Sequence, residues 1–130
     1  MTESKQQEFD NDIVVEVVPT YLSEQSVKDE QRYVFSYQVT IHNYGTEPVK
    51  LLHRHWLITD GNGQVQEVHG EGVVGQQPVI GPDEYYQYES GSVLSTLVGS
   101  MQGHYEMEKQ DEMIKVRIPV FTLAVPNVLN

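Results

Sequence analysis

The sequence predicts an all-β protein in which two antiparallel sheets pack face to face. Short segments rich in β-branched and aromatic residues recur along the chain, and turns rich in glycine, proline, asparagine and aspartate separate them. No stretch long enough for a helix carries the 3.6-residue apolar period of one. Short strands that recur at this spacing are typical of an immunoglobulin-like β-sandwich.

Composition limits the class of protein. The chain has 130 residues, the size of a single domain with a sizeable core. Eight basic residues stand against nineteen acidic ones, and the formal net charge of -11 argues against nucleic acid and anionic membranes as partners. There is no cysteine, which excludes disulfides, thiolate nucleophiles and Cys-ligated zinc. No signal-peptide core or membrane-spanning run occurs, so we expect a soluble, cytoplasmic protein.

A change in composition near residue 12 predicts where the domain begins. Residues 1–11 are polar and charged, which predicts a flexible N-terminal tail, and residues 12–130 form the predicted domain. Within the domain, β-branched runs or alternating patterns predict strands. The predicted strands are Ile13–Val18, Arg32–Asn43, Val49–Thr59, Gln64–Val68, Glu84–Ser90, Met101–Met107, Met113–Ile118 and Val120–Val125.

Prolines and turn residues predict how the strands end. The strand Arg32–Asn43 has the clearest apolar and polar alternation, so we expect one of its faces to be buried. Pro19 is expected to stop the first strand, and Pro119 to separate the last two. The polar segment Leu22–Gln31 is expected to be a surface loop, and Gly91–Ser100 is less regular than its neighbours.

A glycine-rich stretch over residues 69–82 has the spacing of a phosphate-cradling loop. The pattern G-x-G-x-x-G falls at Gly70, Gly72 and Gly75. A dinucleotide site of the Rossmann type needs a helix directly after these glycines, so that a pyrophosphate meets the helix N-terminus. Pro78 follows instead, and no helix is predicted there. The motif therefore does not indicate a Rossmann fold.

Two interpretations of this stretch remain. Glycines are needed where a tight connection crosses between sheets and Cβ atoms would clash, and we favour this structural interpretation. Alternatively, the backbone amides of a glycine-rich turn bind a nucleotide or pyrophosphate anion without a helix. The candidate residues of that anion site are Gly70, Gly72, Gly75, Arg54 and His69.

Two histidines suggest a metal site. His53 and His55 are two residues apart on a predicted strand, so both side chains leave the same face and can bind one divalent cation. A third ligand is required, and Glu67 or His69 on the neighbouring strand is a candidate. The alternative, which we favour, is that one histidine is buried and hydrogen-bonded beside Trp56 while the other is solvated. We therefore predict no cofactor, with a divalent cation as the alternative.

Several motifs lie in order along the chain: Tyr33–Tyr37, Arg54–Asp60, Gly70–Pro78, Gly99–Met107, Ile118–Phe121 and Leu129–Asn130. In this order they resemble the ApaG family, also called CorD, from about Asp12 to the C-terminus. The resemblance implies a fibronectin type III-like β-sandwich. It also implies an association with cobalt resistance and magnesium efflux. In larger eukaryotic proteins, such as some F-box proteins, the family's domain looks like a protein-interaction module.

These observations favour a non-enzymatic protein-interaction domain. The sequence offers no nucleophile, base and orienting group that can be argued together, so no enzyme is predicted. The tyrosine-rich stretch Glu84–Glu89 and the neighbouring Met101, Tyr105 and Met107 place aromatic and thioether side chains on alternate faces. Some of them must be exposed unless a protein partner or a second copy of the chain covers them. An ordinary sandwich strand with tyrosine hydroxyls in water is an equal alternative. The acidic surface favours a basic partner.

Overall fold

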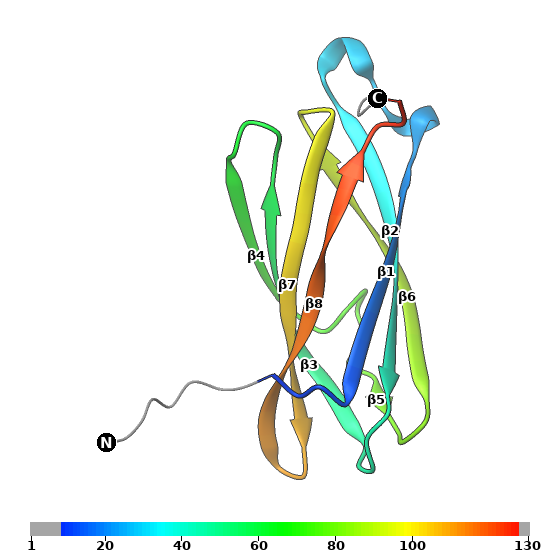
Figure 1. The fold of residues 1–130 in the computed structure, drawn as a ribbon, viewed down its shortest axis with the longest axis vertical. Coiled ribbons are helices and arrows are strands. Elements are labelled where there is room, and N and C mark those ends of the chain that lie inside the picture. Colours follow the sequence, from blue (N-terminus) through cyan, green and yellow to red (C-terminus); the bar gives the residue numbers. More distant parts are fainter. Residues whose placement is uncertain (1–8, 128–130) are drawn as a thin grey trace, which may run out of the picture.

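Two antiparallel sheets form the fold, and the computed structural model describes it over residues 9–127 (Figure 1). One sheet has the order β1-β2-β6, and the other has the order β4-β3-β7-β8 with β5 paired to β3. The predicted fibronectin type III-like β-sandwich is thus confirmed. The strands are β1 (Ile13–Tyr21), β2 (Tyr33–Asn43), β3 (Val49–Thr59), β4 (Val65–Glu71), β5 (Val79–Ile80), β6 (Tyr85–Leu94), β7 (Val98–Lys109) and β8 (Glu112–Ala124).

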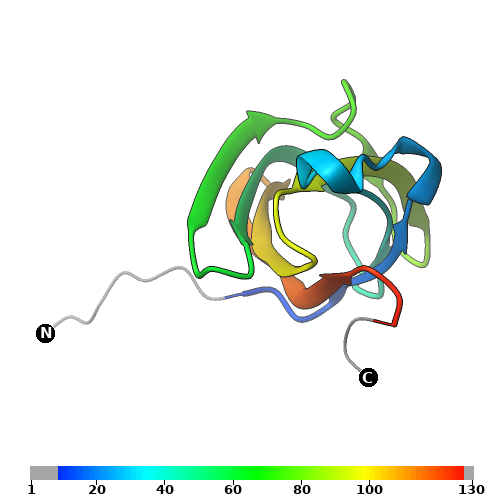
Figure 2. The same ribbon diagram turned by 90° about the horizontal axis from the view of Figure 1, so that it is seen from above.

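The core lies between the sheets and is built from alternate residues of each strand. Every second side chain of β2 from Tyr33 to Ile41 is buried, which confirms the predicted alternation. Trp56 of β3 meets Tyr37 of β2 edge to face, with ring centroids 5.5 Å apart. On one side of the sandwich β1 and β8 lie next to each other (Figures 1 and 2). On the other side, within residues 9–127, no strand pairs with the outer edges of β4 and β6.

A one-residue bulge at Leu52 changes which face of β3 is buried. The register of β3 against β7 shifts between Leu51 and His53, which makes Leu52 the extra residue. Val49 and Leu51 are buried before the bulge, and Trp56 is buried after it. Because side chains alternate with a period of two, a strand without the bulge would turn His53 toward the core.

We predicted that Pro119 would separate two strands, and this prediction is wrong. A second bulge explains why the strand continues. β8 runs without a break from Glu112 to Ala124. Its register against β7 shifts between Met101 and Gly103, where Pro119 and Val120 lie opposite a single residue. Proline has no N–H to donate, and a bulge on an edge strand leaves a position at which none is required.

Two other strand boundaries also differ from the prediction. β1 continues through Pro19 to Tyr21, because β1 is an edge strand where a missing N–H can face away from the ladder. The segment Gly91–Ser100 is more regular than expected, since β6 and β7 both extend into it. Gly91 lies close to the Phe35 carbonyl oxygen, which a Cβ atom would approach to 3.2 Å. The glycine therefore allows close strand pairing instead of ending the strand.

The start of the described chain lies against β8. Residues 1–8 of the predicted tail are outside the described residues, and the division at residue 12 stays a prediction. The Asp10 amide donates to the Lys115 carbonyl at 2.8 Å, and the Asp10 carboxylate pairs with Lys109. The Arg117 guanidinium lies 3.9 Å from the centre of the Phe9 ring. In this described part of the chain, no helix is long and apolar enough to cross a membrane.

Asn43 joins three segments at one end of the sandwich. It is buried, with 1% of its surface exposed. Its amide Nδ2 donates to the carbonyls of Glu47 at 2.8 Å and Ile80 at 2.9 Å, and its Oδ1 accepts from the Gly45 amide at 2.9 Å. The side chain thus fixes the β2-β3 turn to β5.

Replacing Asn43 with alanine is expected to lower the free energy of unfolding by about 3 kcal/mol, because buried backbone groups lose their partners. Urea denaturation followed by tryptophan fluorescence measures this change. Asn62→Ala is the control: Asn62 lies in the exposed Asp60–Gly63 turn, and the expected change is within about 0.5 kcal/mol. Equal costs at the two positions would contradict the proposed role of Asn43.

Candidate functional site

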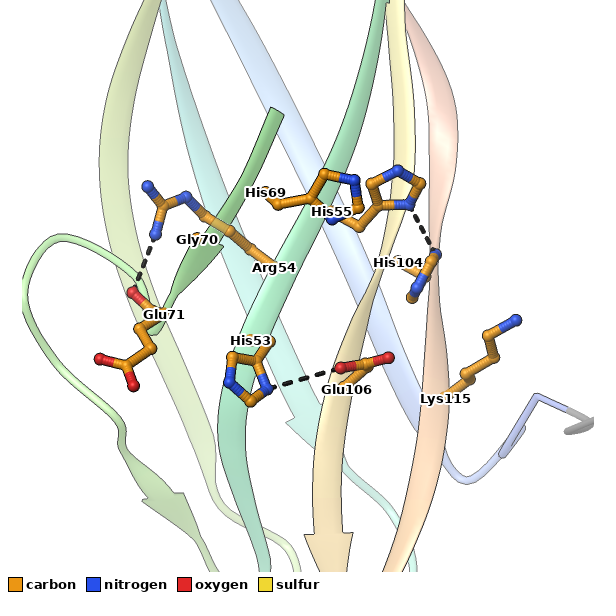
Figure 3. Close-up of a pocket in the computed structure, with 9 residues that line it drawn as sticks. All are labelled: His53, Arg54, His55, His69, Gly70, Glu71, His104, Glu106 and Lys115. Atoms are coloured by element: carbon orange, nitrogen blue, oxygen red, sulfur yellow. Dashed lines mark hydrogen bonds and ion pairs between the residues drawn. The ribbon is translucent and has the colours of Figure 1, made fainter. Parts of the chain in front are cut away.

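The outer face of the larger sheet carries a row of basic side chains. Strand pairing places His55 opposite His69 of β4 on one side and opposite His104 of β7 on the other. Arg117 of β8 lies opposite His104 and completes the row across four strands. These residues share one face because each lies directly opposite the next in the sheet register. Part of this row borders an open cavity of about 590 Å³ (Figure 3).

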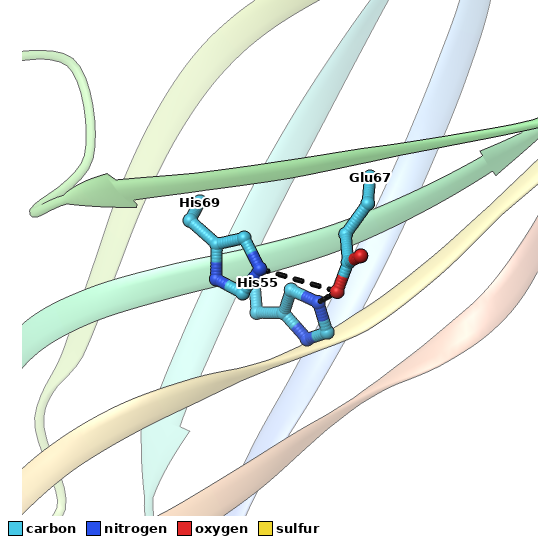
Figure 4. A group of neighbouring side chains, drawn as sticks. All are labelled: His55, Glu67 and His69. Carbon is cyan, nitrogen blue, oxygen red and sulfur yellow. Dashed lines mark hydrogen bonds and ion pairs between the residues drawn. The ribbon is translucent and has the colours of Figure 1, made fainter.

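Glu67 lies beside two of these histidines. Its Oε2 accepts hydrogen bonds from the Nε2 atoms of His55, at 2.6 Å, and His69, at 3.1 Å (Figure 4). The two imidazole rings stack with centroids 4.2 Å apart. These hydrogen bonds, first from His55 and then from His69, lower the pKa of the Glu67 carboxyl. Two stacked imidazoles thus share one carboxylate.

His104 meets the other side of the His55 ring. Their Nδ1 atoms are 3.4 Å apart, so one ring donates and the other accepts. Burial, and secondarily the neighbouring His55, lowers the pKa of His104. Sequence reasoning missed His104. Its two-residue spacing from Glu106 on one strand was the available signal, but only the β3-β7 register shows that both face the β3 histidines.

The two predicted metal-site histidines do not converge. The Leu52 bulge places His53 and His55 on the outer face, so neither is buried beside Trp56, contrary to the interpretation that we favoured. The His53 Nδ1 atom lies 3.4 Å from a Glu106 oxygen on β7. Figure 3 shows this ion pair as a dashed line. His55 instead contacts the carboxylate and imidazole on β4. Besides His104, the side chains that gather around His55 are Glu67 and His69, the two residues named as third ligands.

The glycine stretch forms a tight turn between β4 and β5. The Val73 and Gln76 amides each donate to the other residue's carbonyl, at 2.8 and 2.9 Å. The two residues between them, Val74 and Gly75, both have positive φ, at 47° and 78°, as a type I′ turn requires. Gly72 also has positive φ, and a Cβ atom there would overlap the Gln76 carbonyl oxygen. This geometry supports a structural role for the glycines in a tight connection. The predicted crossing between sheets is wrong, because β4 and β5 both pair with β3 in the larger sheet.

Arg54 anchors this loop from β3. Its Nη1 donates to the carbonyls of Glu71 and Gly72, each at 2.9 Å. The guanidinium crosses over Gly70, where a Cβ atom would lie 2.6 Å from the Arg54 Cζ. Gly70 therefore has no side chain because the arginine occupies that space. Arg54 acts in the structure as a clamp between β3 and the loop.

The five candidate anion-site residues are only partly brought together. Arg54, His69 and Gly70 all border the cavity of about 590 Å³, although the alternation of β4 turns the His69 side chain away from the face on which Arg54 and Gly70 lie opposite each other. The Gly72 amide donates to the Leu52 carbonyl at 2.8 Å. With Arg54 Nη1 and the Val73 and Gln76 amides also bonded to carbonyls, many of the donors that an anion needs are already used.

A cleft of about 370 Å³ opens between the sheets on the side where β4 and β6 are not joined. Trp56 and Met101 lie at its base, and Ser90 and Ser92 of β6 line one wall. Sequence reasoning identified the tyrosine-rich strand but missed this cleft, because it depends on how far apart the two sheet edges lie.

The tyrosines of β6 divide between its two faces, as their spacing predicts. Tyr85 faces solvent with 63% of its surface exposed, whereas Tyr86 and Tyr88 pack partly against the core. The Tyr88 and Tyr105 hydroxyls hydrogen-bond to each other, and burial raises the pKa of both phenols. Tyr88 is thus mainly structural, and Tyr85 remains available for contact.

Comparison with known proteins identifies the family. A family model described as the ApaG domain matches residues 23–109. Protein ApaG of Escherichia coli is 52% identical over 119 residues, which cover 91% of this chain and 95% of that protein. The chain belongs to the ApaG family. Protein ApaG of Shigella boydii matches it with the same identity and coverage.

Solved structures agree with this assignment to the ApaG family. A Northeast Structural Genomics Consortium target solved by X-ray crystallography superposes with a TM-score of 0.87 at 47% identity, covering 92% of this chain and 91% of that chain. A Bordetella pertussis protein described as ApaA superposes with a TM-score of 0.86 at 46% identity, covering 90% and 96%. The sandwich is therefore the fold of its solved relatives.

Gly72→Ala is expected to lower the free energy of unfolding by about 3 kcal/mol, because it combines an unfavourable positive φ with a clash against the Gln76 carbonyl. Gly75→Ala is the matched control in the same loop: its φ is also positive, but nothing lies within 4 Å of the added Cβ. We expect it to cost about 1 kcal/mol. Thermal and urea denaturation measure both, and similar costs would show that the close approach at Gly72 is unimportant.

The pH dependence of stability is expected to reflect His104. Its pKa is lower in the folded chain than its ordinary value of 6.5, so the unfolded chain binds more protons as the pH falls below that value. Its contribution to stability is therefore complete above pH 6.5 and decreases at lower pH. Urea denaturation in a chelating buffer at about pH 7.5 and about pH 5.5 should show a smaller loss in His104→Gln than in the unmodified chain. Equal losses of stability in the two proteins would exclude His104 as a source of the pH dependence.

Proposed function

We propose that this ApaG-family chain is a non-enzymatic binding domain that takes an extended, basic segment of a partner protein along β6. The observation that carries this proposal is the lack of protection on the outer edge of β6. The edge lies beside the cleft between the sheets, which supplies room for side chains. Adding a strand to a free sheet edge is a common way for β-domains to bind peptides.

The other edge strands carry features that oppose pairing with an added strand. β1 and β8 contain Pro19 and Pro119 and lie next to each other. β4 has seven residues and carries Glu67, His69 and Glu71. β6, in contrast, has ten residues with no proline, lysine or arginine among them. Proteins commonly protect free edges with prolines, charges or short length, so a ten-residue edge with no proline and Glu89 as its one charged residue is suited to an added strand.

The cleft and the charge favour a particular kind of segment. A strand added to β6 would place alternate side chains over the cleft, whose base contains the apolar Trp56 and Met101. Glu89 on β6, with Asp83 and Glu84 just before the strand, adds negative charge to a chain whose net charge is -11. Because Arg54 also lines the cleft, the apolar side chains of the segment would face the cleft and its basic side chains would lie on the outer face of β6, where Glu89 is.

A binding role without catalysis is supported by the partners of the histidines. His42 and His53 lie beside Glu16 and Glu106, and His55 and His69 share Glu67. Within residues 9–127, the imidazole hydrogen bonds of His55, His69 and His104 go to the Glu67 carboxylate or to another imidazole, and not to a hydroxyl that could be activated for nucleophilic attack. The cytoplasmic location, the homodimer alternative and the role in cobalt or magnesium homeostasis implied by the resemblance stay predictions.

Anion binding at the glycine loop is the less supported alternative. Arg54 Nη1 and the amides of Gly72, Val73 and Gln76 already donate to carbonyls. Binding a pyrophosphate through them would break these bonds, and Glu71 within the loop opposes a negative ligand. The loop geometry favours a connection that holds its own shape.

The proposal is tested by selecting random peptides from a displayed library against the full chain, and then measuring the selected peptides by fluorescence anisotropy. We expect selected sequences to alternate apolar and basic residues. Ser92→Trp, which fills the cleft, should weaken their binding by about tenfold or more. Val18→Trp is the control on the exposed face of β1, and it should leave binding unchanged.

Chemical-shift changes in the same titration locate the bound peptide. We expect them to concentrate on the backbone amides of β6. No enrichment from the library, or equal loss of binding in the two tryptophan variants, would contradict the proposed surface.

A further inference from the structure

We propose that His55, Glu67 and His69 form a binding site for a divalent transition-metal ion on the outer face of β3 and β4. Each residue offers one ligand atom, and these atoms all lie within 4.8 Å of one another. Figure 4 shows the three side chains directed toward a common point. The site lies on the opposite face of the sheet from the cleft beside β6 and does not depend on peptide binding there.

The sheet register preorganises this site. His55 on β3 lies directly opposite His69 on β4, and Glu67 lies two residues before His69 on the same face. All three residues are in regular strands, where hydrogen bonds to the neighbouring strand fix the backbone. Binding a cation therefore requires only side-chain adjustment, which keeps its cost in conformational entropy low.

The ligand atoms indicate which cations would bind. Two imidazole nitrogens and one carboxylate oxygen suit zinc and cobalt, which accept nitrogen and oxygen ligands at about 2.0–2.2 Å. Magnesium and calcium prefer oxygen ligands throughout and are disfavoured here. Three protein ligands leave a coordination position for water. The net charge of -11 attracts cations in general, whereas Arg117 and Lys115 on β8 oppose them at the far end of the histidine row.

A supporting contact for His55 is already in place. A histidine that binds a metal through one ring nitrogen commonly uses the other nitrogen in a hydrogen bond, which fixes the orientation of its ring. If His55 binds through Nε2, its Nδ1 faces the Nδ1 of His104 at 3.4 Å. His104 is thus a positioning residue and does not itself contact the ion.

His53 provides a matched control. It lies on the same strand and the same face as His55, but its imidazole lies beside Glu106 of β7 (Figure 3). Removing His53 deletes an imidazole of the same chemical type without touching the three proposed ligands. The side chain of His69 is 69% exposed, so its replacement should leave the fold intact.

The test is calorimetric titration of the full chain, first freed of metal with a chelator, with zinc, cobalt and magnesium chlorides in turn. We expect one zinc or cobalt ion per chain and no magnesium binding. His69→Ala and Glu67→Gln should each weaken zinc binding by more than about 100-fold, and His104→Gln by about tenfold. His53→Ala should bind zinc as tightly as the unmodified chain.

Two further readings distinguish ligand loss from misfolding. The melting temperature of each variant without metal should stay close to that of the unmodified chain, and zinc should raise it for His53→Ala but not for His69→Ala. The visible spectrum of the cobalt complex reports its coordination. The proposal is overturned if zinc does not bind stoichiometrically, if magnesium binds equally well, or if His53→Ala weakens binding as much as His69→Ala.

Discussion

The bulge at Leu52 is the constraint on which the rest of the larger sheet depends. One extra residue switches which alternate positions of β3 face the core, so that Leu51 faces it before the bulge and Trp56 faces it afterwards. The same change turns His55 outward, where the register with β4 and β7 supplies its neighbours. Without it, the buried face would contain imidazoles and the tryptophan would face water. A single insertion thus separates the core from the histidine row.

The bulge also supports the glycine loop. Its Leu52 carbonyl accepts the Gly72 amide at 2.8 Å and the Gln77 side-chain amide at 3.0 Å. Arg54, two residues further along β3, also holds the loop, because its side chain donates to the Glu71 and Gly72 carbonyls. Bulge, clamp and tight turn therefore act as one unit. This explains why a motif with phosphate-loop spacing occurs in an all-β chain: its glycines are required by contacts within the protein.

The sequence was sufficient to predict the strands, because alternation such as that of Tyr33 to Ile41 follows directly from burial of one face. The sequence did not predict that the buried face of β3 changes at the bulge. The change could be recognised in principle, since the buried positions are odd-numbered at Val49 and Leu51 and even-numbered at Trp56. The adjacent residues Leu51 and Leu52 are both apolar, however, so the sequence does not show at which residue the bulge lies. Pro119 misled for a related reason: proline ends a strand within a ladder, yet a bulge at an edge accommodates it. The partners of His55 depend on register, which no local pattern specifies.

β4 links the two proposed binding surfaces. Its residues alternate between them, with Glu67 and His69 on the outer face and Val68 lining the cleft on the inner side. β4 is an edge strand held by pairing to β3 alone, so a ligand that bridges His55 to His69 stabilises that pairing. The same pairing fixes one wall of the cleft. Coupling between two binding sites is reciprocal in free energy. If a bound cation orders this wall and so raises the affinity for a peptide, a bound peptide raises the affinity for the cation by the same factor. The two surfaces have no ligand-binding residue in common, but both depend on the position of β4.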